Sequence, residues 1–135
     1  MNVTDVAREE RGMALLRQLA GEQASEVADG LKRLSPDMWS FLADFAYGSV
    51  LSRPALDIAK RQLATVAILT ALGHSPTQLR FHIGAALNVG CGPEEILEVI
   101  LQTAVYAGFP AALNALAIMR EVFRDRGIVV QSGGG

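Results

Sequence analysis

The sequence predicts an all-α protein, and the placement of its prolines and glycines carries most of that prediction. Each proline precedes a run with helical periodicity, as expected at the first position of a helix, where the missing N–H group costs nothing. Glycines close the same runs, because a glycine readily adopts the left-handed turn that ends a helix. The prolines are Pro36, Pro54, Pro76, Pro93 and Pro110, and the closing glycines are Gly48, Gly73, Gly90 and Gly108.

About seven helices follow from this punctuation and from the periodicity of the apolar residues. Ser35 and Ser75 precede two of the prolines and are N-cap candidates. Acidic residues such as Asp37 and Glu94 fall in first turns, where the helix dipole favours negative charge. No strand is expected. The predicted helices span residues 4–20, 22–33, 36–47, 54–72, 76–89, 93–107 and 110–126.

The most apolar segment is predicted to be the central helix of the fold. Residues 63–72 are apolar nearly all round, which is typical of a helix enclosed on every side. The 93–107 helix is amphipathic and places Glu98 on its polar face. Its last turn, residues 104–108, loses that polarity, so we expect this turn to be buried.

Length and composition predict a single domain, residues 1–130, followed by a linker-like tail, residues 131–135. Half of the 135 residues are hydrophobic and 19% are charged, which is more apolar surface than one small core hides. We therefore expect burial between subunits. The net charge is −2 and no basic run exceeds two residues, which argues against a nucleic-acid partner.

Cys91 is the only cysteine, so an intrachain disulfide, a dithiol pair and a thiolate metal cage are excluded, and a reducing cytoplasm fits. The first residues are polar and acidic, unlike a signal peptide. No apolar run approaches the ~18 residues of a membrane span. The sequence predicts a cytoplasmic protein with no membrane partner.

The two histidines, His74 and His82, lie on either side of the predicted helix break at Gly73. Few other groups move a proton near neutral pH. His82 falls about two turns into its helix, on the same face as Gln78. From spacing alone, His82 fits a satisfied core or interface residue as well as a catalyst, and His74 fits a helix C-terminal cap.

Arg61 and the two tyrosines are further candidates. Arg61 shares a stripe with apolar residues of the central helix, where it fits either an anion clamp or a salt bridge to Asp57. Tyr47 and Tyr106 each come just before a closing glycine, so they either pack or line a pocket. Glu98 fits a solvated face, a salt bridge or a subunit contact.

Several segments, in their order and spacing, resemble the carboxymuconolactone decarboxylase family. These are Ser52-Arg-Pro-Ala-Leu-Asp57 followed by Arg61, Leu79-Arg-Phe-His82, Ala85-Ala-Leu-Asn88, Glu94-Glu-Ile-Leu-Glu98 and Ala104-Val-Tyr-Ala-Gly-Phe-Pro-Ala-Ala112. The resemblance covers roughly residues 35–123. It implies an alkyl hydroperoxidase D-like all-α fold with a central helical pair, and a ring-shaped homo-oligomer, a trimer or a hexamer, whose active sites lie near subunit contacts.

The sequence also departs from its relatives. Alkyl hydroperoxidase D-like proteins resemble this chain but carry a C-x-x-C-x-x-x-H motif, of which only His82 is matched, so dithiol peroxidase chemistry is excluded. The acid of their proton relay matches Gln62 here. Tyr47 and Leu51 stand where the decarboxylases often have tryptophan, and the break before His82 is about one residue longer.

The resemblance implies a cofactor-free decarboxylase acting on a small carboxylated lactone, of the 4-carboxymuconolactone type, or a related β-keto-type acid in aromatic breakdown. Loss of carbon dioxide leaves a dienolate, so the site needs a cation, an oxyanion donor and an acid. Arg61 fits the first role and His82 the third. Tyr106, Tyr47 and His74 are candidate oxyanion donors, and Gln78 and Glu98 complete the predicted substrate-binding set.

Two alternatives remain open at this point. One keeps the pocket and changes the reaction to isomerisation, cyclisation or hydrolysis of a lactone. The other is an oligomeric ligand-binding module that has kept the fold and lost catalysis. Gln62, the altered helix break and the missing tryptophans favour this alternative.

Overall fold

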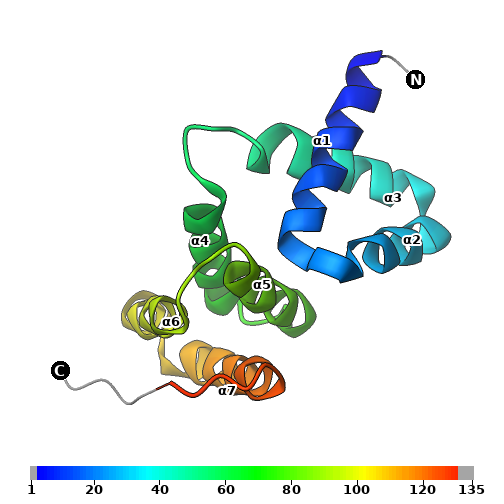
Figure 1. Cartoon of the computed structure of the whole chain (residues 1–135). Helices are drawn as coiled ribbons and strands as arrows, with labels where there is room; N and C mark the ends of the chain where they lie inside the picture. The colour runs from blue at the N-terminus through cyan, green and yellow to red at the C-terminus, as the bar shows by residue number, and fades with distance from the viewer. Residues whose placement is uncertain (1–2, 131–135) are drawn as a thin grey trace. The chain divides into compact units, whose positions relative to one another are not determined.

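The computed structural model describes residues 3–130, with side chains from residue 6 onward. This part of the chain is helical and contains no strand, so the all-α prediction is confirmed. The chain forms two compact units, residues 1–61 and 62–135, with the boundary inside α4 (Figure 1). The elements are α1 (Val3–Ala20), η1 (Gly21–Gln23), α2 (Ala24–Leu34), α3 (Pro36–Phe41), η2 (Leu42–Leu51), α4 (Ile58–Leu72), α5 (Pro76–Asn88), α6 (Pro93–Ala107) and α7 (Phe109–Asp125).

In the first unit, α1 packs closely against η2 because two glycines remove side chains from the contact. A Cβ at Gly12 would overlap the carbonyl oxygen of Ala43, and one at Gly48 would overlap that of Arg8. Gly48 is buried inside η2, so its prediction as a helix-closing glycine is wrong. Trp39 anchors the same core: it is 3% exposed, and its Nε1 donates to Glu9 at 3.0 Å.

The chain between α3 and α4 differs from the prediction at both ends. The helical segment that begins at Pro36 does not end at Tyr47. It continues to Leu51 as the π-helix η2. Residues 52–57 then form a loop, so Pro54 does not begin a helix. The reason is Asp57, whose Oδ1 accepts the backbone N–H of Lys60 at 3.0 Å and so caps α4 just before Ile58.

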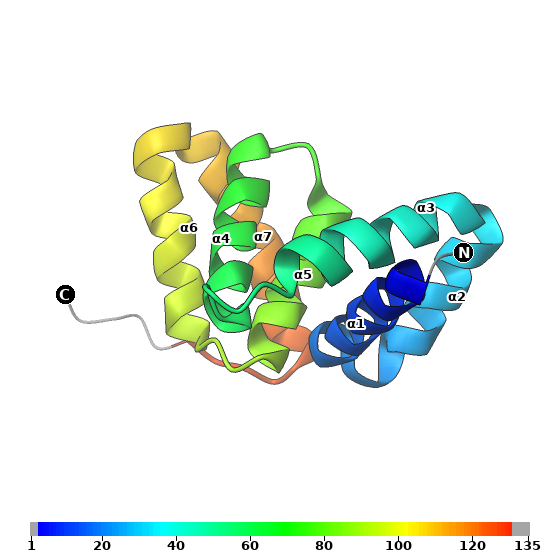
Figure 2. The same cartoon turned by 90° about the horizontal axis from the view of Figure 1, so that it is seen from above.

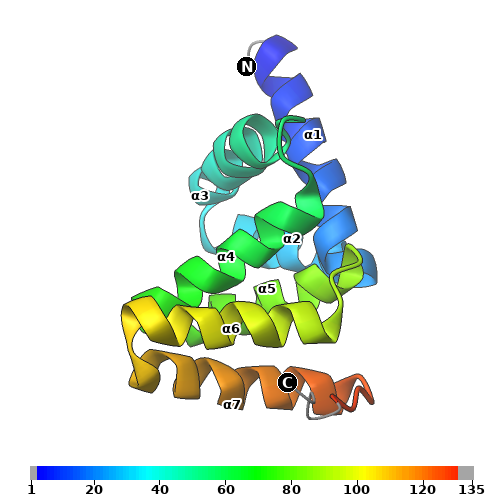
Figure 3. The ribbon, with the colours of Figure 1, turned by 90° about the vertical axis from the view of Figure 1, so that its left-hand side faces the viewer.

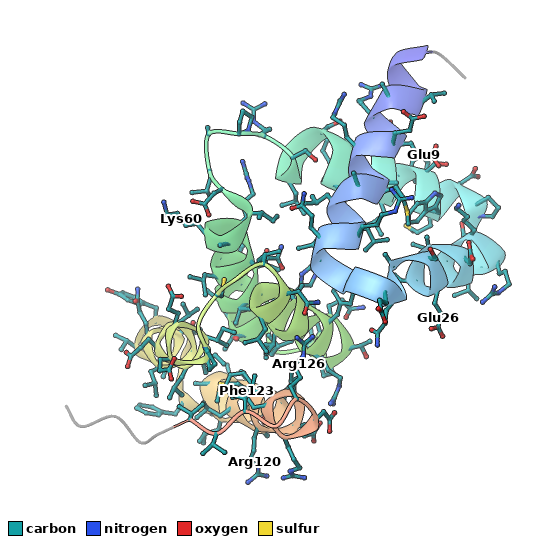
Figure 4. All side chains as sticks on the ribbon, viewed as in Figure 1. Glu9, Glu26, Lys60, Arg120, Phe123 and Arg126 are labelled. Carbon is teal, nitrogen blue, oxygen red and sulfur yellow. The ribbon has the colours of Figure 1, made fainter. Side chains whose placement is uncertain are left out.

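In the second unit, α7 packs against both α5 and α6, and Figure 3 shows α6 and α7 side by side. The small residues Gly84, Ala85 and Ala86 are buried on α5. At the end of α7, Arg126 donates to Asn88 Oδ1 at 2.7 Å, which ties that end to α5 (Figure 4). The fully buried side chains of this core include Val66, Ile83, Ile96 and Ile100.

The central helix is not enclosed on every side within this chain, which corrects the prediction. In the part of α4 that belongs to the second unit, Gln62, Val66 and Thr70 are buried, whereas Ile68 is 58% exposed. The last turn of α6 is also not buried as expected, because Tyr106 is 87% exposed. Apolar periodicity predicts that a side chain will be covered, but it does not say that the same chain covers it.

Candidate functional site

The helix break predicted around Gly73 is present and frames the candidate site. Gly73 has a φ of +75°, which ends α4, and Pro76 begins α5. Ser75 stands at the N-cap position, but its side chain makes no capping bond, whereas Ser35 Oγ accepts from Met38 N as predicted. The Ser75 hydroxyl instead lies 3.2 Å from Nδ1 of exposed His74.

His82 lies on α5, two turns beyond the break, and is largely shielded from solvent. Its ring meets that of Phe81 edge to face, with centroids 5.0 Å apart. Its Nδ1 lies 2.9 Å from Oε1 of Gln62 on α4. Burial lowers the pKa of His82 from 6.5 to about 4, because a charged imidazolium is poorly solvated there. The ring is therefore neutral at pH 7.

This depressed pKa predicts a pH dependence of stability. Between pH 6.5 and 4 the unfolded chain binds a proton at His82 more readily than the folded chain does. The stability from neutral His82 is complete above pH 6.5 and lost as the pH falls through about 4, and it amounts to at most about 3 kcal/mol. His82→Asn, whose amide N–H can replace Nδ1–H, should remove this part of the slope.

Urea unfolding of both proteins between pH 4 and 7.5 measures that difference, and subtracting the two curves cancels the carboxylates that both proteins share. If the free energies of unfolding of the two proteins change in parallel between pH 4 and 7.5, His82 has an ordinary pKa in the folded protein.

Gln62 is the residue that sequence reasoning undervalued. The sequence identifies Gln62 only as the residue that replaces an acid, yet it is fully buried and is the hydrogen-bond partner of His82. Its Nε2 has no hydrogen-bond partner among the described residues. The sequence does carry a signal for Gln62, which is a lone amide near the start of the mostly apolar central helix. Its partner His82 lies on another helix, so spacing along the chain cannot reveal the contact.

Arg61 belongs to the first unit, where it holds the loop before α4. Its Nε donates to the carbonyl of Leu56 at 2.9 Å and its Nη2 to that of Arg53 at 3.1 Å. The carboxylate of Asp57 pairs with Lys60 at 3.2 Å, near the start of α4 (Figure 4). Both acceptors are backbone carbonyls, so these two bonds hold the guanidinium beside the loop.

The loop that Arg61 holds also lines a groove of about 310 Å³ in the first unit. Arg11 on α1 and Arg53 on the loop bring two cations to this groove, and Asp57 brings one anion. Its remaining lining is mostly apolar, including Leu15, Leu51 and Leu56. The first unit therefore offers a cavity in which an acidic group and an apolar group could both be accommodated.

The other predicted site residues are in different surroundings. Tyr47 is buried in the first unit, and burial raises the pKa of its hydroxyl, so it stays protonated and able to donate. Gln78 and Glu98 are exposed on α5 and α6. Among the residues singled out from the sequence in the second unit, hydrogen bonds join His82 with Gln62 and His74 with Ser75.

Tyr106 lines a second groove, of about 510 Å³, between α4 and α6, which lie next to each other in Figure 2. The groove floor is made of small and aliphatic side chains, with Gln102, Thr103 and Tyr106 as its polar members. None of the lining residues is charged, so a bare carboxylate has no counter-ion there. The lining residues are Leu63, Ala64, Ala67, Ile68, Ala71, Val99, Gln102, Thr103, Tyr106 and Ala107.

Among the described side chains, residues 6–130, there is no cluster of three or more His, Cys, Asp or Glu able to hold a metal ion. In the same part of the chain, no helix is both long and apolar enough to cross a membrane. The thiol of Cys91 is buried and does not form a disulfide.

Residues 36–121 match the model of the carboxymuconolactone decarboxylase family. This range contains both His82 and Gln62, together with Arg61 and the apolar groove. The chain belongs to the carboxymuconolactone decarboxylase family.

Individual relatives extend the likeness beyond that range. A 4-carboxymuconolactone decarboxylase of Acinetobacter baylyi is 36% identical over 127 residues, 93% of this chain and 94% of the relative. An uncharacterized 15.0 kDa protein of Paracoccus denitrificans is 30% identical over 70% of this chain and 72% of its own length. A nitrosuccinic acid decarboxylase of Metarhizium robertsii is 32% identical over 62% of this chain and 58% of its own length.

Proposed function

We propose that the protein is a carboxy-lyase that removes carbon dioxide from a small carboxylated lactone of the 4-carboxymuconolactone type, or from a related β-keto-type acid, in the breakdown of aromatic compounds. The observation that carries this proposal is the 36% identity to a 4-carboxymuconolactone decarboxylase over nearly the whole of both chains. A histidine that is neutral at pH 7 and held by one buried partner supplies a group for proton transfer.

The substrates named for two of the relatives share one chemical property, which supports this reaction class. In 4-carboxymuconolactone, loss of carbon dioxide leaves an electron pair that spreads onto the lactone carbonyl oxygen. In nitrosuccinic acid, the corresponding pair spreads onto the nitro oxygens. Both carbanions are delocalised onto oxygen, so no metal or organic cofactor is needed to accept the electrons.

We propose the following roles for the individual residues. Arg61 holds the substrate carboxylate, because a guanidinium matches a carboxylate in shape and charge. His82 returns a proton to carbon. A donor to the developing oxyanion comes from Tyr106, Tyr47 or His74, while Gln78 and Glu98 make further substrate contacts.

The neutral state of His82 sharpens its role. A ring with a pKa of about 4 carries no spare proton at pH 7, so it must take one up before it can donate. A substrate carboxylate close to the ring raises the pKa and favours that uptake. We therefore propose that substrate binding and protonation of His82 are coupled.

We also propose that the protein works as a homo-oligomer, a trimer or a hexamer, in which the groove between α4 and α6 is covered by another copy. The groove has no charged lining residue. Exposed aromatic and aliphatic side chains at and beside it include Ile68, Val105 and Tyr106. A contiguous apolar surface of this kind is more typical of a subunit contact than of a surface left in water.

Incubation of the purified protein with 4-carboxymuconolactone, nitrosuccinate and a simple β-keto acid tests the reaction class, with released carbon dioxide and product mass as readouts. We expect release from at least the lactone, with a product lighter by one carbon dioxide. A product of unchanged mass would indicate an isomerase, and gain of water would indicate a hydrolase. Either outcome contradicts the proposal.

A further inference from the structure

Gln62 is an unusual residue for its place in the second unit. It lies on the buried line of α4 with Val66 and Thr70, and it is fully buried. Thr70 satisfies its hydroxyl within the helix by donating to the carbonyl of Val66 at 2.7 Å. Gln62 instead directs Oε1 at His82, on another helix, and its Nε2 has no partner among the described residues.

Burying the Nε2 group without a hydrogen-bond partner lowers stability, so an apolar side chain of similar size would stabilise this position more. Buried polar groups that are left unsatisfied in native proteins call for an explanation. The side chain of Gln62 forms its hydrogen bond with His82, so we expect the buried amide to serve through its effect on the histidine.

The hydrogen bond determines which ring nitrogen carries the proton. An amide oxygen has no proton to give, so at 2.9 Å from Gln62 Oε1 it must be Nδ1 of His82 that donates. A neutral imidazole has one N–H group. Nε2 is then left with a free lone pair and is the ring atom able to accept a proton.

We propose that Gln62 is a positioning residue that holds His82 in its Nδ1–H tautomer, so that Nε2 is the atom that takes up the proton and returns it to the substrate. A glutamate at the same place would also accept from Nδ1, but its charge would favour the imidazolium form. The amide orients the ring without adding charge.

The consequence for the reaction rests on the proposed function. The bond between the ring carbon and the carboxylate breaks, its electron pair moves into the conjugated system, and carbon dioxide leaves. Nε2, protonated from solvent when the anionic substrate binds, then gives that proton to carbon and is neutral again. The tautomer itself is a property of the free protein and can be tested without any substrate.

Nitrogen NMR of the ¹⁵N-histidine-labelled protein at pH 7 tests the tautomer. The His74→Gln variant leaves one histidine and so assigns the signals. We expect His82 to show a protonated Nδ1 and an unprotonated Nε2. A protonated Nε2, which the opposite orientation of the Gln62 amide would produce, or a fully protonated ring would overturn the proposal.

Three variants test the role in the reaction. Gln62→Leu removes the acceptor, so the Nε2–H tautomer should become populated and kcat should fall by up to about 100-fold, with KM changed much less. Gln62→Glu restores the acceptor and should restore the Nδ1–H bond while raising the pKa of His82. Thr70→Val alters another buried polar residue of the same helix face and should change neither the tautomer nor kcat.

The possible results separate the two proposals. If the parent protein has the expected tautomer but decarboxylates none of the acids, the proposed function fails and the positioning of His82 stands. If it decarboxylates and Gln62→Leu shifts the tautomer without lowering kcat, the positioning role in catalysis is wrong. The NMR measurement on the unaltered Gln62 protein decides the tautomer even where a variant does not fold.

Discussion

Replacing His82 with asparagine is expected to lower kcat/KM for decarboxylation by about 10²- to 10⁴-fold, the usual contribution of a positioned acid or base. The asparagine amide can keep the bond to Gln62 Oε1 in place of Nδ1–H, so the fold should survive. It offers nothing at the position of Nε2, and proton return to carbon should fail. Carbon dioxide release under initial-rate conditions measures the effect.

A matched control is Arg120→Gln, which removes a charge from an exposed position on α7. Helical circular dichroism should be the same for the two variants and the parent, and only His82→Asn should lose activity. Release at the parent rate from a folded His82→Asn protein would mean that the proton comes from another group.

Introducing a charge into the apolar groove is expected to dissociate the proposed homo-oligomer. Ile68 is 58% exposed on α4 and lines the groove, so Ile68→Glu should leave the single chain folded. In the covered state the carboxylate would be buried without a counter-ion, because the groove lining has no charged residue. The sedimenting mass should fall from a multiple of the chain mass to that of one chain.

Arg120→Glu is the control for this second experiment, since it places a carboxylate on α7 outside the groove and should leave the proposed assembly intact, although it changes the net charge by −2 rather than −1. A parent protein that sediments as a single chain would contradict the proposed oligomer. An Ile68→Glu protein with the parent's mass would place the subunit contact elsewhere.

The helix starts were predictable where the signal is local. Pro36, Pro76 and Pro93 each begin a helix as expected, because proline at the first position needs only its own backbone angle. Pro54 fails because the next helix is capped by Asp57, three residues further along. The prediction that Gly48 closes a helix is wrong because this glycine allows the close approach of α1. No local sequence pattern records such an approach.

The candidate site was also predictable only where its signal is local in the sequence. His82 was found because histidine is rare in this chain and lies beside a helix break. Its partner Gln62 could not be found in this way, because the contact joins two helices and the two residues are twenty positions apart in the sequence. The exposure of Ile68 and Tyr106 was missed because periodicity measures how apolar a face is, whichever chain covers it.

Reaction of the parent protein with 4-carboxymuconolactone in heavy water, followed by mass spectrometry and proton NMR of the product, tests whether the protein removes carbon dioxide and returns a solvent proton to carbon. We expect a product that has lost one carbon dioxide and gained one deuterium on carbon, in a single stereochemical configuration, because His82 delivers a solvent-derived proton to one face. Recovery of the lactone or of an isomer with its carboxylate intact would contradict it.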